Sequence, residues 1–179
     1  MRSFSPLFFI PVAAICTPAY AVEYLTVEQA QKALFSQADH FEEAFLELNE
    51  DQRDQIKDLS DVRQRWKTQK MWKAYQGSEF LGWFIVDKVI GKHEFITYAT
   101  ALDPNGGVLS IEIMDYRESY GSEITGAPWR AQFKGIQDPN TIRFNKNIAN
   151  ISGATLSCRN VSNGVKRLLA IYQLFLKQA

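Results

Sequence analysis

Three strand-like runs in the centre of this sequence constrain its fold more than any other feature. Aromatic and β-branched residues concentrate in these runs, at residues 81–90, 94–102 and 108–116. The sequence DPNGG at 103–107 is a strong turn signal between the last two runs. The final run alternates, which places Leu109, Ile111 and Ile113 on one face. The pattern predicts an antiparallel hairpin or meander with one buried face.

Helices are expected before these strands. Thr26 with Gln29 and Asn49 with Gln52 have the residue types of a helix capping box. Behind the first box, apolar residues recur at helical spacing, namely Ala30, Ala33, Leu34, Phe41, Phe45 and Leu48. The second box opens a polar helix, and the dense charge of residues 39–67 is typical of a solvated helical face.

A further helix closes the chain. Its apolar stripe is expected at Val161, Val165, Leu168, Leu169, Tyr172 and Leu176. Residues 117–141 between sheet and helix are irregular and polar. Helices, then strands, then a closing helix predict an α+β fold with an antiparallel sheet of hairpin or meander strands.

The composition fits one globular domain and excludes some functions. The 179 residues are 46% hydrophobic, enough for a substantial core. Lys plus Arg total 20 and Asp plus Glu total 20, so no net charge favours nucleic acid. Two histidines and two cysteines without ligand spacing give no metal site. No Ser–His–Asp pattern or GxSxG elbow appears, so no catalytic residue is assigned.

The N-terminus has the parts of a secretory signal peptide. A basic residue, Arg2, precedes a short apolar stretch broken by prolines and then the small-x-small site Ala19–Tyr20–Ala21. Cys16 follows a large residue, which argues against a lipid-attachment site. We therefore expect a signal peptide at 1–21 and an exported, periplasmic protein, with an uncleaved membrane anchor as the alternative. The mature chain keeps one cysteine, Cys158, and hence no internal disulfide.

The stretch ISGATLSCRN at 151–160 places small and hydroxyl residues directly before the closing helix. Ser and Thr at such a place are ordinary helix N-caps. A hydroxyl there also lies beside unpaired backbone N–H groups and the positive end of the helix dipole, which suit a phosphate. Thr155 could therefore carry a phosphate ester instead of only capping the helix.

ISGATLS resembles the flavin-attachment motif of the FMN-binding domain family. That family includes the C subunit of the sodium-pumping NADH:quinone oxidoreductase and the G subunit of the Rnf complex. Its members carry FMN through its phosphate on the last residue of the motif, which corresponds to Thr155 here. An extracytoplasmic ApbE-family flavin transferase, using FAD and magnesium, makes this link.

A second patch supports the resemblance. The family has a Glu-Thr-Pro-Gly-like loop after a strand, and here Glu118, Ser119, Tyr120 and Gly121 stand at that loop. The family's turn and following strand match DPNGG and the run after it. The resemblance covers roughly residues 79–172, so we expect an FMN-binding domain at 79–179, preceded by an N-terminal helical region at 22–78.

The resemblance and the neighbouring residues give a set of candidate flavin contacts. Trp129, in a polar stretch, is expected on the isoalloxazine ring, and Arg117 could face the ring edge or the phosphate, or form a surface ion pair. The expected cofactor-binding residues are Arg117, Glu118, Tyr120, Gly121, Trp129, Ser152, Gly153, Ala154, Thr155, Leu156 and Ser157. The position that is acidic in many family members is Ala149, so noncovalent FMN, or no flavin, stays open.

Two functions from different classes follow. The first is an exported electron carrier with covalent FMN on Thr155, which passes electrons to or from a membrane redox protein and is not itself an enzyme. The alternative is a cofactor-free periplasmic binding or interaction module with the same fold. A yellow colour that survives denaturation separates them.

The N-terminus gives the first testable prediction. We expect the exported protein to begin at Val22, because Ala19–Tyr20–Ala21 forms the cleavage site. N-terminal sequencing of the exported protein checks this. Recovery of intact residues 1–21 in the membrane fraction would instead establish the anchored form.

Overall fold

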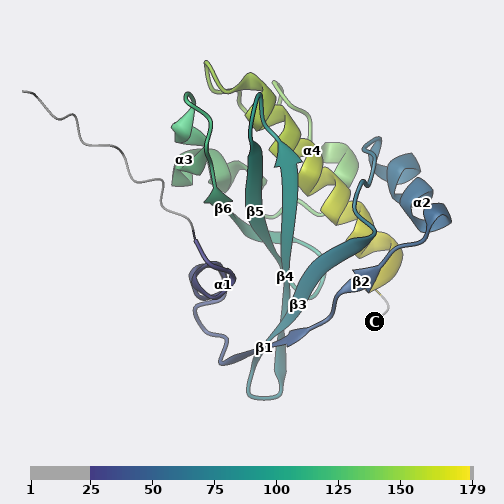
Figure 1. Ribbon diagram of the computed structural model, residues 1–179. Helices are drawn as coiled ribbons and strands as arrows, with labels where there is room; N and C mark the ends of the chain where they lie inside the picture. Colours follow the sequence, from purple (N-terminus) through teal and green to yellow (C-terminus); the bar gives the residue numbers. More distant parts are fainter. Residues whose placement is uncertain (1–24, 178–179) are drawn as a thin grey trace, which may run out of the picture.

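The computed structural model describes residues 25–177 (Figure 1). The predicted signal peptide, Cys16 and Val22 lie outside this range. The α-helices are α1 (Val27–Leu34), α2 (Glu50–Ser60), α3 (Ala127–Arg130) and α4 (Thr155–Ile171). The strands are β1 (His40–Glu43), β2 (Leu46–Glu47), β3 (Thr68–Gln76), β4 (Glu79–Ile90), β5 (Phe95–Leu102) and β6 (Val108–Asp115). Short helical turns are η1 (Ser122–Thr125), η2 (Ala131–Phe133), η3 (Pro139–Thr141) and η4 (Tyr172–Leu176). No helix within residues 25–177 is long and apolar enough to span a bilayer.

The sheet is an antiparallel meander, which confirms the predicted α+β class. Strands β3, β4, β5 and β6 are neighbours in sequence and in space, and each pairs antiparallel with the next. Strands β1 and β2 pair in succession with the outer edge of β3. The three strands expected from the sequence are therefore present, and β3 adds a fourth long strand.

Both faces of the sheet are covered, whereas the alternating pattern predicted one buried face. Helix α4 covers one face and α1 covers the other (Figure 1). Small and aromatic side chains fill the α1 face, among them Ala30, Trp72, Phe84, Ala99 and Ala101. The pattern of a strand does not show whether a helix covers its second face. Here that face is covered by α1, a short helix that lies outside the strand segments.

Leu109 does not lie on the buried face with Ile111 and Ile113. In the register of β5 with β6, Ala101 pairs with Ser110 and Leu102 with Val108, which leaves Leu109 in a bulge. Leu109 is 37% exposed, and Val108 is buried in its place. A bulge adds one residue to a strand and so reverses the alternation beyond it.

The two predicted capping boxes are confirmed. Thr26 and Gln29 cap α1 reciprocally, and Asn49 and Gln52 cap α2 in the same way. The helical continuation through Phe41, Phe45 and Leu48 is wrong, because α1 ends at Leu34 and the chain then forms β1 and β2.

The aromatic residues of this segment explain the difference. Phe41 packs edge-on against Phe84, and Phe45 packs edge-on against Trp72. These contacts hold the segment against the sheet, and tertiary packing of this kind overrides the local helical spacing.

Helix α4 is the closing helix that the sequence predicts, and all six residues of its expected stripe are buried. A polar cluster lies in its contact with the sheet. Asp87 of β4 accepts a hydrogen bond from the Tyr98 hydroxyl at 2.6 Å and pairs with Arg167 of α4. All three side chains are buried.

This buried ion pair gives a stability prediction. We expect Asp87→Ala to lower the free energy of unfolding by about 3–5 kcal/mol, because it leaves the Arg167 guanidinium buried without its counter-charge. Urea denaturation measures the loss. Asp115→Ala, which removes an ion pair with exposed Arg117, is the matched control and should cost less than about 1 kcal/mol. Equal losses in both variants would contradict a special role for the buried pair.

Candidate functional site

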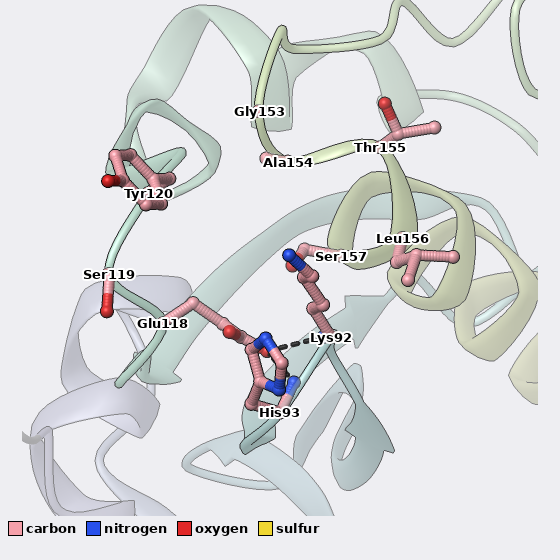
Figure 2. A pocket seen from close by; sticks show the side chains of 10 residues that line it. All are labelled: Lys92, His93, Glu118, Ser119, Tyr120, Gly153, Ala154, Thr155, Leu156 and Ser157. Atoms are coloured by element: carbon pink, nitrogen blue, oxygen red, sulfur yellow. Dashed lines mark hydrogen bonds between the residues drawn. The ribbon is translucent and has the colours of Figure 1, made fainter.

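A pocket lies where three segments meet: the start of α4, the loop after β6, and the turn between β4 and β5 (Figure 2). Its cavity volume is about 350 Å³. The lining residues are Lys92, His93, Glu118, Ser119, Tyr120, Gly153, Ala154, Thr155, Leu156 and Ser157. The two sequence motifs, which lie far apart along the chain, therefore form one site.

The first turn of α4 has no side-chain cap. Ala154 occupies the N-cap position, and neither Ser152 nor any other side chain accepts a hydrogen bond there. The backbone N–H groups of Thr155, Leu156 and Ser157 thus have no acceptor among the described residues. These donors and the helix dipole favour an anion at this end of the pocket.

Thr155 is the first residue of α4 and lies on the rim of the pocket. Its hydroxyl accepts a hydrogen bond of 3.1 Å from the Asn150 amide and points away from Lys92 and His93 (Figure 2). Gly153 beside it has φ of +83°, a conformation that suits glycine, and its only near neighbour at the Cβ position is the Tyr120 Cβ at 3.6 Å. The hydroxyl is therefore accessible from outside the pocket.

The loop after β6 packs directly on the start of α4. Gly121 has φ of +79°, and a Cβ at this residue would lie 2.1 Å from the Ala154 Cβ. Tyr116 fixes the same contact, since its hydroxyl donates to the Tyr120 carbonyl at 2.6 Å and lies 3.4 Å from Ser157 Oγ. Small residues at 121 and 154 are thus a steric requirement for bringing the two motifs together.

The Glu118 carboxylate holds the turn between β4 and β5. Its Oε1 accepts hydrogen bonds from the backbone N–H groups of His93 at 2.7 Å, Glu94 at 3.1 Å and Lys92. Burial raises the pKa of Glu118, but these three donors together outweigh burial, so that the pKa lies below its ordinary value. The side chain therefore stays ionised and positions Lys92 and His93.

Lys92 and His93 are the site residues that sequence reasoning missed. They stand in a four-residue turn, GKHE, whose composition resembles any exposed hairpin turn. Figure 2 shows the Lys92 side chain extending toward the first turn of α4. The turn bounds the pocket only because Glu118 binds it, and no local sequence signal carries that information.

Four expected contacts lie outside the pocket lining. Ser152 is exposed beside it, and Gly121 supports it from behind through Ala154. Arg117 forms an ion pair with Asp115, which matches the alternative that the sequence left open. Trp129 was expected on the flavin ring, but it is buried against Phe133 and donates to the Ala149 carbonyl at 2.8 Å.

Trp129 and Gln132 together fix the backbone of Ala149. The Gln132 amide oxygen accepts from the Ala149 N–H at 2.7 Å, and the Trp129 indole N–H donates to the Ala149 carbonyl. Both peptide groups beside Ala149 are thus held before the chain reaches Thr155. Trp129 positions the loop that leads to the site.

Other ionisable groups near the pocket favour their neutral forms. Burial raises the pKa of the Tyr116 hydroxyl and of the Cys158 thiol. Cys158 is fully buried, so it behaves as a core residue. Within residues 25–177 no cluster of His, Cys, Asp or Glu is arranged to hold a metal ion.

The site fits an organic phosphate joined to a flat ring. Unpaired N–H donors of α4 and the Lys92 ammonium suit the phosphate. Tyr120 and Leu156 are 77% and 42% exposed, and they offer apolar surface to a ring. The volume lies near the lower end of the range of roughly 300–1,000 Å³ that is typical of small-molecule sites.

The family comparison agrees with this geometry. Residues 91–170 match the model of the FMN-binding domain family, and all the pocket-lining residues lie within this match. Residues 91–170 are therefore similar to the FMN-binding domain of this family.

Two solved structures have a similar fold. The crystal structure of NqrC from Shewanella oneidensis is similar with a TM-score of 0.57 and 13% identity, over 82% of this chain and 86% of that one. The C subunit of the Na⁺-translocating NADH-quinone reductase from Parabacteroides distasonis has a TM-score of 0.53 and 13% identity, over 85% and 84%. At these identities the likeness shows the fold. No curated protein matches the sequence.

The role of Glu118 in the turn gives a pH-dependent prediction. We expect Glu118→Ala to lower the free energy of unfolding by about 1–3 kcal/mol at pH 7, because three backbone donors lose a charged acceptor. A lowered folded pKa means that the stabilisation is complete above the ordinary value of 4.5 and is lost as the pH falls through the folded value. Urea denaturation of the wild type and of Glu118→Ala should show a smaller difference in the free energy of unfolding at pH 3 than at pH 7.

The exposed carboxylate of Glu123 provides the control. Glu123→Ala should change stability by less than about 0.5 kcal/mol at either pH. A Glu118→Ala effect that stays the same at pH 3 would show that the charge of Glu118 does not hold the turn.

Proposed function

We propose that this protein is an exported electron carrier with FMN bound covalently through a phosphodiester to Thr155. An ApbE-family flavin transferase attaches the cofactor, and a membrane redox protein is the electron-transfer partner. The observation that carries the proposal is the position of Thr155 at an uncapped helix N-terminus, inside the part of the chain that matches the FMN-binding family.

Thr155 suits covalent modification better than its neighbours do. Ser157 is buried near Tyr116, where an enzyme cannot reach it. Ser152 is exposed, but it precedes the helix and does not share the first-turn N–H groups. Thr155 combines an accessible hydroxyl with those donors, and Asn150 orients its oxygen.

The chain's own residues can bind the two halves of the cofactor. The N–H groups of the first turn of α4 stabilise the negative charge of a phosphodiester. Lys92 lines the pocket that the rest of the cofactor would occupy. Tyr120 and Leu156 shield part of a ring from water. Glu118 acts indirectly, since it keeps the Lys92–His93 turn in place.

The cofactor supplies reversible electron transfer when bound. The described residues offer no nucleophile–base pair at the pocket, so we assign no substrate chemistry to the protein. The name of the similar structure from Parabacteroides distasonis refers to a subunit of a Na⁺-translocating NADH-quinone reductase, which favours a membrane protein as the partner here.

The test is the loss of covalent flavin on a single substitution. After co-expression with a flavin transferase, Thr155→Ala should abolish flavin fluorescence in a denaturing gel, because the linking oxygen is removed. The free energy of unfolding should fall by less than about 1 kcal/mol, since Thr155 caps no backbone group and loses only the hydrogen bond from Asn150. Peptide mass mapping of the wild-type protein identifies the residue that carries the flavin.

Ser152→Ala and Ser157→Ala are matched controls and should retain denaturation-resistant flavin. Flavin on Thr155→Ala would refute the attachment site. A wild-type protein that never acquires flavin would favour the cofactor-free binding module, with the same pocket serving another anion.

A further inference from the structure

A second, larger pocket lies on the other side of the β4–β5 turn, between α4 and the segment that joins α2 to β3. Its cavity volume is about 600 Å³. It is lined by Val62, Arg63, Arg65, Trp66, Lys88, Val89, Ile90, Phe95, Asn160, Asn163, Gly164 and Arg167. We name it the basic–aromatic pocket. It shares no lining residue with the candidate flavin site.

Four cations and no carboxylate line the basic–aromatic pocket. Arg63, Arg65 and Lys88 are exposed and form no ion pair with any described residue. Arg167 is 4% exposed, and its Nε atom is buried without a hydrogen-bond acceptor. Arg167 is already paired with Asp87, so the unpaired charge of this pocket comes from Arg63, Arg65 and Lys88, whose N–H groups can donate to an anion.

The pocket also exposes large apolar side chains. Trp66, Ile90 and Phe95 are 37%, 44% and 45% exposed, and Trp66 and Phe95 lie with ring centroids 6.5 Å apart. Two further contacts fix this wall: the Trp66 indole N–H donates to the Lys88 carbonyl at 3.3 Å, and Lys88 Nζ lies 4.6 Å from the Phe95 ring centroid. A ligand here meets an apolar surface directly beside positive charge.

Hydrogen bonds hold the walls in place. Arg167 Nη1 donates to the Arg63 carbonyl at 3.3 Å, which ties the α2–β3 segment to α4. The Asn160 amide donates to the Ile90 carbonyl at 2.7 Å, which ties the end of β4 to α4. The pocket is therefore formed before any ligand binds, which lowers the entropic cost of binding.

We propose that the basic–aromatic pocket binds a phosphate group attached to an apolar or acyl group. Arg63, Arg65 and Lys88 bind the phosphate. Trp66, Ile90 and Phe95 pack against the apolar part. More than half of the lining comes from residues 62–90, outside the match to the FMN-binding domain, so the proposal does not depend on the flavin function.

Soluble phospholipid analogues test the proposal with the purified protein. Trp66 is the most exposed of the four tryptophans, the others being at most 9% exposed, so tryptophan fluorescence reports on this pocket. We expect dihexanoyl-phosphatidylglycerol to shift the emission to the blue, with saturation below its micelle concentration. Dihexanoyl-phosphatidylcholine, which has no net charge, should bind at least about 10-fold more weakly, a difference of roughly one bidentate charge contact.

Two double variants distinguish binding by the cations of this pocket from nonspecific attraction to positive charge elsewhere on the protein. Arg63→Gln/Arg65→Gln should weaken the binding of dihexanoyl-phosphatidylglycerol at least about 10-fold. Lys134→Gln/Lys146→Gln removes two exposed cations elsewhere and should leave binding unchanged. Both pairs are exposed, so circular dichroism should report intact folds. Flavin attachment to Thr155, measured in parallel, should stay unchanged in each variant, which keeps the two proposals distinguishable.

Three results would overturn the proposal. The first is no fluorescence response to dihexanoyl-phosphatidylglycerol, and the second is that the Arg63→Gln/Arg65→Gln variant binds this lipid as tightly as the wild type does. The third is that inorganic phosphate binds as tightly as the lipid. Co-sedimentation with vesicles of phosphatidylglycerol and phosphatidylcholine then identifies the source of the ligand. Binding to these vesicles indicates a membrane lipid, and binding to the soluble analogue alone indicates a free amphipathic phosphate. Either result supports the pocket's assignment.

Discussion

The packing of α4 across the β-meander determines the rest of the structure. Its apolar stripe is buried against β4 and β5, and the Arg167–Asp87 ion pair fixes its position along the sheet. Gly164 permits the close approach, since a Cβ there would lie 2.0 Å from the Tyr98 hydroxyl oxygen. With the helix held in this way, its first turn lies beside the β4–β5 turn and the loop after β6. Both pockets described above depend on that placement.

The candidate flavin site is made by loops that stabilise one another. Glu118 binds the β4–β5 turn, Tyr116 fixes the loop after β6, and Trp129 holds the segment before Thr155. Glu118 and Trp129 each belong to one segment and hold another, whereas Tyr116 fixes its own loop. The side chains that can touch a cofactor are thus fewer than those that give the site its shape.

The sequence predicted the parts of the fold that depend on local patterns. Capping boxes, three long strands and the closing helix need only neighbouring residues, and all are present. The errors have long-range causes. Phe41 and Phe45 lie in or beside strands, not in a helix, because they pack on distant aromatic residues. Leu109 is displaced by a bulge that only the register with β5 reveals. For the site, the motif SGAT indicated Thr155, but Lys92 and His93 lie at the pocket solely through the reach of Glu118.

The openness of the candidate flavin site has a consequence for how tightly it must bind. A shallow pocket with exposed Tyr120 and Leu156 buries little of a ring and gives weak intrinsic affinity. A bond to Thr155 would raise the local concentration of the cofactor to the millimolar range or above, as a short tether does for any linked ligand. Weak contacts then suffice to keep the ring in place, and one ring edge can remain exposed to a passing partner. The covalent bond would keep the cofactor on the protein, so the pocket residues would need only to orient the ring.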